Sequence, residues 1–210
     1  MEFYENSQSP ERALLIGVDT GEYNAEISME ELALLSETAG AEIIGTVIQK
    51  LEAPSPATYI GSGRMSEVAA FCRNNDIDLI IADSELTPSQ INNIETKTDT
   101  RVVDRTMLIL DIFAARARSS EGKLQVELAQ LKYSLPFLSG RGKSMSRLGG
   151  GIGTRGPGES KLESDKRHIR RRIHSLSEEL KRVEKRRDLI RSRRKKDGVI
   201  TVAIVGFTKA

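Results

Sequence analysis

The hydrophobic positions of this chain follow two different periods, and the change falls near Thr106. Before it, short runs rich in β-branched residues alternate with stretches of helical pattern. The runs predict strands at 13–19, 42–49, 77–83 and 101–103, and the stretches between them predict helices at 29–38, 62–74 and 88–97. This order predicts an α/β fold over residues 1–104, with a small parallel sheet, flanking helices and right-handed crossovers.

From Thr106 onward the apolar residues step by alternating threes and fours, which is the heptad spacing of a packing seam. One seam runs from Met107 to Leu138 and a second from Leu162 to Ile190. If the chain folds back between them, the two seams face each other, with Leu128 opposite Ile169. Residues 105–197 therefore predict a long antiparallel two-helix hairpin.

The loop that joins the two predicted helices, residues 139–158, contains eight glycines and four basic residues, with no Asp or Glu. At about 1.5 Å per residue, roughly 35 helical residues reach about 50 Å. We therefore expect this loop at the tip of an arm, well clear of the sheet. A flexible linker is the alternative interpretation, but antiparallel helices need only about 2 to 8 connecting residues.

A segment of this composition favours binding to nucleic acid. Basic side chains neutralise phosphates, and glycines let the backbone approach closely. The candidate binding residues, for which the family resemblance described below implies ribosomal RNA, are Arg141, Lys143, Arg147, Gly149, Gly150, Gly151, Gly153, Arg155, Gly156, Gly158 and Lys161.

The formal net charge of +2 hides a strong asymmetry along the chain. Residues 1–138 carry 11 basic and 22 acidic side chains, whereas residues 139–196 carry 20 basic and 7 acidic ones. Such a basic region on an acidic body favours a nucleic-acid partner. A coiled-coil adaptor that binds an acidic protein partner is the alternative from another functional class.

Several other classes of function find little support. The longest apolar runs are far too short to span a bilayer and no N-terminal signal is recognisable, so we expect a cytoplasmic protein without a membrane partner. Cys72 is the only cysteine, and His168 and His174 have no ligand cluster around them, so we expect no metal site. No catalytic constellation is found.

A nucleotide-binding α/β domain with a ligand near Gly61 and Arg64 is a weaker alternative, since a tight turn and helix cap explains that segment better.

The end of the sequence has the pattern of a buried strand, 199–205, followed by Gly206, Phe207, Thr208, Lys209 and Ala210. This is the first half of a phosphate-binding loop, G-x-x-x-x-G-K-[ST]. The Gly, Lys and Ser or Thr that complete the motif would come next. Residues 198–210 are therefore interpreted as the start of a further domain.

Three stretches resemble a known family: VVDRTMLILDIFAARARSSEGKLQVELAQLKYSLP at 102–136, RLGGGIGTRGPGESKLE at 147–163, and VAIVGFTKA at 202–210. They closely resemble HflX, a family of ribosome-associated GTPases. The resemblance implies an N-terminal domain with an α/β and a two-helix subdomain, followed by a Ras-like GTPase domain. It also implies binding to the large ribosomal subunit and splitting or rescue of stalled ribosomes, with the hairpin loop near the peptidyl transferase region of the 23S-type rRNA.

The resemblance also sets expectations for cofactors. GTP and Mg²⁺ are expected for the full-length family member with its own GTPase domain. No cofactor, catalytic residue or GTPase activity is expected for residues 1–210 alone, because the Lys and Ser or Thr that contact phosphates and Mg²⁺ lie beyond Ala210. Lys209 stands where the family usually has an Asn that helps to hold a monovalent cation, so potassium dependence is not carried over.

Overall fold

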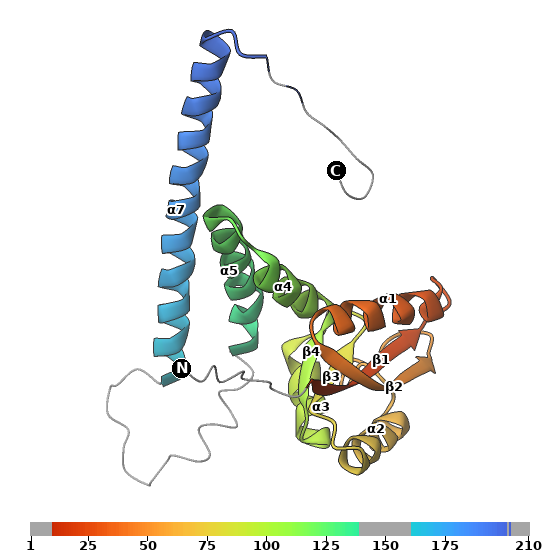
Figure 1. Ribbon diagram of the computed structural model, residues 1–210. Helices are drawn as coiled ribbons and strands as arrows, with labels where there is room; N and C mark the ends of the chain where they lie inside the picture. Colours follow the sequence, from red (N-terminus) through yellow and green to blue (C-terminus); the bar gives the residue numbers. More distant parts are fainter. Residues whose placement is uncertain (1–9, 139–160, 201, 203–210) are drawn as a thin grey trace, which may run out of the picture.

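The computed structural model describes residues 10–138, 161–200 and 202, and it contains an α/β body and a set of long helices (Figure 1). The strands of the body are β1 (Glu11–Asp19), β2 (Ala41–Lys50), β3 (Leu79–Ala82) and β4 (Arg101–Asp104). Its helices are α1 (Ala25–Thr38), α2 (Ser62–Asn74) and α3 (Pro88–Thr98). The predicted strands and helices are thus all present, with ends shifted by a few residues.

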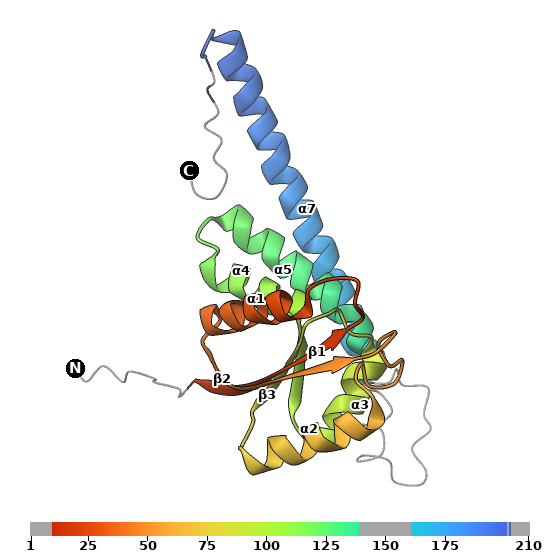
Figure 2. The same cartoon turned by 90° about the vertical axis from the view of Figure 1, so that its right-hand side faces the viewer.

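All four strands pair in parallel, in the order β2-β1-β3-β4. Figure 2 shows α1 and α4 (Arg105–Arg116) on one face of the sheet and α2 and α3 on the other. The predicted α/β class with a small parallel sheet and flanking helices is therefore confirmed.

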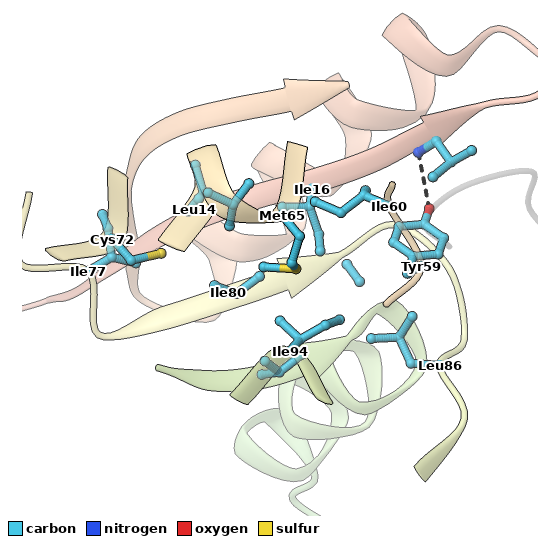
Figure 3. Close-up of a cluster of buried hydrophobic side chains, with 14 residues drawn as sticks. Leu14, Ile16, Tyr59, Ile60, Met65, Cys72, Ile77, Ile80, Leu86 and Ile94 are labelled. Atoms are coloured by element: carbon cyan, nitrogen blue, oxygen red, sulfur yellow. Dashed lines mark hydrogen bonds between the residues drawn. The ribbon is translucent and has the colours of Figure 1, made fainter. Parts of the chain in front are cut away.

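The core consists of two layers because β1 and β3 are buried on both faces. Alternate residues of each strand point to opposite faces, so Leu14 and Ile80 pack with Met65 and Ile94 under α2 and α3 (Figure 3). Their neighbours Leu15 and Ile81 pack with Met29, Leu32 and Leu108 under α1 and α4. This double burial explains why both strands read as continuous apolar runs in the sequence.

The helical region differs from the prediction in one important respect. The sequence predicted one helix from 106 to 138, but the structure has α4, α5 (Ser120–Ser134) and a short 3-10 helix, η1 (Leu135–Phe137). Ala117 adopts an extended backbone with φ −66° and ψ 111°, and the Ser119 hydroxyl caps α5 by accepting from the Gly122 N–H. The heptad seam continues across this break, and for that reason the pattern did not reveal it.

Because of the break, α4 and α5 form a helical hairpin of their own. Gln130 of α5 donates to the Asp111 carboxylate of α4 at 2.8 Å, and the Tyr133 hydroxyl donates to the Asp104 carboxylate at the end of β4. The C-terminal end of α5 therefore returns to the sheet. The predicted position of residues 139–158 lies outside the described residues.

The last helix, α7 (Lys161–Lys196), packs along α5 with the opposite chain direction (Figure 1). Leu176 is fully buried at this contact, and Arg172 pairs with Glu127 of α5. The opposite chain directions of α5 and α7 confirm the predicted antiparallel pairing for the α5 part of the first seam. The predicted register holds near Glu127 but not at Glu121, which pairs with Arg187 instead of lying opposite Leu176. We call α5 and α7 together the arm. The 36 residues of α7 span about 54 Å, and its C-terminal turns extend beyond α5 (Figure 1).

Candidate functional site

Most of the predicted RNA-binding residues lie outside the described residues. This applies to Arg141, Lys143, Arg147, Arg155 and Gly149, Gly150, Gly151, Gly153, Gly156 and Gly158. Lys161 is the first residue of α7, and nothing is said of its side chain. Gly206–Ala210 and most of the predicted strand 199–205 also lie outside the described residues. The structure therefore describes the helices that flank the basic segment.

The inner face of α7 is structural. Leu176 is buried, and Ile169, Ile173 and Leu180 are half-buried, as expected for a heptad seam. Two arginines reinforce this face by pairing with carboxylates of α5. The Arg172 guanidinium makes a bidentate contact with Glu127 at 2.7 and 2.9 Å, and Arg187 pairs with Glu121 at 2.7 Å.

The outer face of α7 carries a dense set of cations in its first turns. A shallow hollow there is lined by Glu163, Lys166, Arg167, Arg170, Arg171 and His174. Four permanent cations thus face one carboxylate, and Arg170 and Arg171 are exposed. Their spacing of three and four residues places them on successive turns of one helical face, about 5 to 6 Å apart. We call these four side chains, Lys166, Arg167, Arg170 and Arg171, the basic face.

A second basic cluster occupies the last turns of α7 and consists of Arg191, Arg193, Arg194, Lys195 and Lys196. Cations at this end also interact favourably with the negative end of the helix dipole. The cluster lies about 35 Å along the helix from the basic face. It is therefore separate from the basic face on α7.

The crevice between the carboxyl ends of β1 and β3 is where an open parallel sheet ordinarily binds a ligand. Here the buried ring of Tyr59 fills it (Figure 3). The Tyr59 hydroxyl accepts from the Val18 N–H and donates to Ser84 Oγ, both at 3.2 Å. Burial raises the pKa of this hydroxyl, partly offset by those two hydrogen bonds. The crevice is thus used for packing.

Next to it, a buried ion pair ties the sheet to two helices. Asp83, at the end of β3, accepts from Arg105 of α4 at 2.7 Å, and the same guanidinium contacts Ser28 and Glu31 of α1. Hydrogen bonds to Glu31 and Asp83 raise the pKa of Arg105 despite its partial burial. These charges are compensated within the body.

The predicted turn at the start of α2 is also structural. Gly61 is the N-cap residue, and its N–H donates to Gln49 Oε1 at 2.8 Å. Arg64 pairs with Glu67 one turn along the same helix. The interpretation of this segment as a tight turn and helix cap is therefore supported, and no described feature favours a nucleotide there.

Sequence reasoning missed the contact that joins the arm to the body. Asp104 is almost fully buried, and its carboxylate accepts from the N–H groups of Leu86 and Met107 as well as from Tyr133. Burial raises the pKa of the Tyr133 hydroxyl, and the bond to Asp104 raises it further. Tyr133 lies between seam positions, so the hydrophobic pattern contains no signal for this role.

Among residues 10–138 and 161–200, no group of three or more His, Cys, Asp or Glu side chains is arranged to hold a metal ion. Within the same part of the chain, no helix is long and apolar enough to cross a membrane.

Comparison with known proteins agrees with this architecture. A family model described as GTP-binding GTPase N-terminal matches residues 26–114, and one described as GTP-binding GTPase Middle Region matches residues 116–194. The chain is 53% identical over 206 residues to the GTPase HflX of Caldanaerobacter subterraneus subsp. tengcongensis, covering 98% of this chain and 48% of that protein. It is 39% identical to the GTPase HflX of Escherichia coli, covering 99% and 49%.

A solved structure is similar as well. The crystal structure of a GTP-binding protein from the hyperthermophilic archaeon Sulfolobus solfataricus in complex with GDP matches with a TM-score of 0.56 and 26% identity. That match covers 83% of this chain and 46% of the other. The chain spans about half the length of the curated relatives that it matches. Two consecutive family models and this level of identity show that the chain belongs to the HflX family of GTPases.

Proposed function

We propose that this chain is the ribosome-binding region of an HflX-type GTPase. In this proposal the arm binds the large ribosomal subunit through 23S-type rRNA near the peptidyl transferase region. The full-length protein, which also carries a GTPase domain for GTP and Mg²⁺, splits or rescues stalled ribosomes.

The observation that supports this function is the basic face of α7. It carries four cations on successive turns and follows directly in sequence after the glycine-rich basic segment at 139–158. Within the basic face, Arg167, Arg170 and Arg171 are exposed and Lys166 is half-buried. Phosphate contacts by such cations supply most of the sequence-independent affinity for nucleic acid.

The described end of α5 sharpens the proposal. Tyr133 holds the C-terminal end of α5 against Asp104 at the end of β4. The last described residues before the segment therefore lie beside the sheet (Figure 1). The rRNA contact is then expected at the foot of the arm, beside the body, and the C-terminal basic cluster provides a second contact further along α7.

Co-sedimentation with purified large and small ribosomal subunits, from about 50 to 200 mM salt, tests the proposal. Removing one cation that neutralises a phosphate should flatten the slope of log affinity against log salt by roughly 0.7 to 0.9. Replacing Arg141, Lys143, Arg147 and Arg155 by Ala should therefore lower the slope by up to about 3, and the double change Arg170→Ala with Arg171→Ala by up to about 1.5.

Arg172→Ala is the matched control. It lies next to Arg171 on the same helix, but Glu127 holds its guanidinium against α5. It should leave the slope nearly unchanged. Gly150→Ala and Gly156→Ala should weaken binding with little change in slope, since they alter fit and leave charge alone.

An unchanged affinity and slope in both multiple-Ala variants would overturn the proposal. Binding that competitor RNA cannot displace would instead favour the adaptor with an acidic protein partner. Equal affinity for the two subunits would contradict the assignment to the large one.

A further inference from the structure

A cavity of about 260 Å³ lies at the joint between the body and the arm, and the functional proposal makes no use of it. It runs beside β4, the edge strand of the sheet, whose outer side has no strand partner among the described residues. Helices α3 and α4 flank it, and α5 with η1 closes it. Its lining residues are Pro88, Ile91, Asn92, Glu95, Arg101, Val102, Val103, Asp104, Met107, Asp111, Tyr133, Ser134 and Phe137.

The walls of this cavity are mostly apolar. Ile91, Val103, Met107 and Phe137 are half-buried, and the Tyr133 ring packs against Phe137 with centroids 5.3 Å apart. The volume is close to the lower end of the range for small-molecule sites, about 300 to 1,000 Å³. Sites of this class are frequent at interfaces between domains. The size and the walls suit a flat organic group such as a bicyclic ring.

The charge of the lining is negative. It includes three carboxylates and a guanidinium, Arg101, which pairs with Glu11 at 2.7 Å. Asp104 accepts three hydrogen bonds, whereas Glu95 accepts from the Val102 N–H and Asp111 from Gln130, both neutral donors that leave the carboxylate charge in place. Two of the carboxylates follow a common pattern, because each stands one turn after an apolar wall residue of its own helix: Glu95 after Ile91, and Asp111 after Met107. On both α3 and α4, an apolar residue that lines the cavity is therefore followed one turn later by a carboxylate.

We propose that this cavity binds a small amphipathic organic cation, with its ring between Ile91 and Met107 and its nitrogen toward Glu95 and Asp111. A cleft whose lining carries a net negative charge attracts cations. Since its walls come from the body and from α5, a ligand here also bridges the joint that Tyr133 and Asp104 form. The site is independent of the basic face, and its failure would leave the RNA proposal untouched.

Three indole probes of similar shape and different charge test the inference: tryptamine (cationic), tryptophol (neutral) and indole-3-propionate (anionic). Each is titrated into the isotope-labelled 210-residue chain, and amide chemical shifts are followed by NMR. Tryptamine should shift Val102, Val103, Met107 and Tyr133 saturably, with a Kd at least about tenfold below that of tryptophol, and indole-3-propionate should bind most weakly.

Asp111→Asn keeps the side-chain shape and removes a charge from an exposed position. It should reduce the preference for tryptamine over tryptophol severalfold and leave tryptophol binding unchanged. Glu95→Gln should act in the same direction. Ile91→Trp, which fills the cavity, should abolish binding of all three probes, and its amide spectrum reports whether the fold is intact.

The proposal is overturned if tryptamine produces no saturable shift up to about 10 mM. It is also overturned if tryptophol binds as well as tryptamine, because the ligand class would then be apolar, or if the shifts are scattered over acidic surfaces away from β4.

Discussion

The body and the arm belong to one chain, yet their charged side chains are arranged differently: those of the body described above are paired or hydrogen-bonded, and several of those on the arm are exposed. In the body, Asp83 and Arg105 neutralise each other, and Asp104 accepts three hydrogen bonds. In the arm, Arg172 and Arg187 pair inward while Arg170 and Arg171 point outward and are exposed. A compensated charge holds structure together, and an exposed cluster of one sign attracts a partner. We therefore expect stability to depend on the body and binding to depend on the outer face of α7.

The two regions also differ in how they are packed. The body has two core layers around β1 and β3. The arm depends on a single seam, in which Leu176 is the only residue of described α7 that is buried. We therefore expect the arm to open more easily than the body.

The largest expected effect is that of Leu176→Asp. This substitution places a charge in the seam and should destabilise the packing of α7 on α5 by about 3 kcal/mol or more. Hydrogen exchange should accelerate in α5 and α7 while the sheet remains protected. Leu189→Asp is the matched control, because Leu189 lies on the same helix with 73% of its surface exposed. Unchanged exchange in α5 after Leu176→Asp would contradict the paired-helix arrangement.

Tyr59→Phe should destabilise the body and spare the arm. It removes the acceptor of the Val18 N–H and the donor to Ser84 in a buried crevice. The expected loss is about 1 to 3 kcal/mol in the free energy of unfolding, measured with urea, with unchanged RNA affinity. Tyr23→Phe should cost less, because Tyr23 is 42% exposed. A loss of RNA affinity in Tyr59→Phe would show that the body takes part in binding.

Tyr133→Phe tests the joint between the two regions. It should lower the free energy of unfolding by about 1 kcal/mol near neutral pH. The pKa of Tyr133 is raised in the fold, so the stability it contributes is complete below the pKa of an unfolded tyrosine, about 10, and is lost as pH rises above it. From about pH 8 to pH 11 the wild type should lose more stability than the variant. If the free energies of unfolding of the wild type and of Tyr133→Phe changed in parallel over that pH range, the hydrogen bond from Tyr133 to Asp104 would be contradicted.

The smallest effect is expected for Glu127→Gln. Its ion pair with Arg172 is exposed, and exposed pairs contribute little to stability. The urea midpoint should not change measurably. The released Arg172 should steepen the salt dependence of RNA binding by at most about 0.9. A large loss of stability would mean that this pair, rather than Leu176, holds α7 on α5.

Much of the body could be predicted because its signals are local. The sequence predicted a helix at 88–97, and α3 begins at Pro88 with a capping box between Thr87 and Gln90. The run at 77–83 predicted a strand, and β3 lies within it with all of its residues buried. The break at 117–119 was missed because no Gly or Pro marks it and the heptad spacing continues through it. Leu108 and Ile112 must pack on α1, while α5 must reach α7, and one straight helix does not do both.

The sequence by itself determined the α/β order, the two heptad seams with their antiparallel pairing, and the separation of acidic body from basic region. These depend on periodicity and composition, which are properties of neighbouring residues. Only the tertiary structure decided that the end of α5 contacts the sheet through Tyr133, which arginines of α7 pair with α5, and that Tyr59 fills the crevice of the sheet. It also created the cavity beside β4. Each of these requires residues far apart in sequence to meet, and such contacts are set by packing that no local pattern encodes.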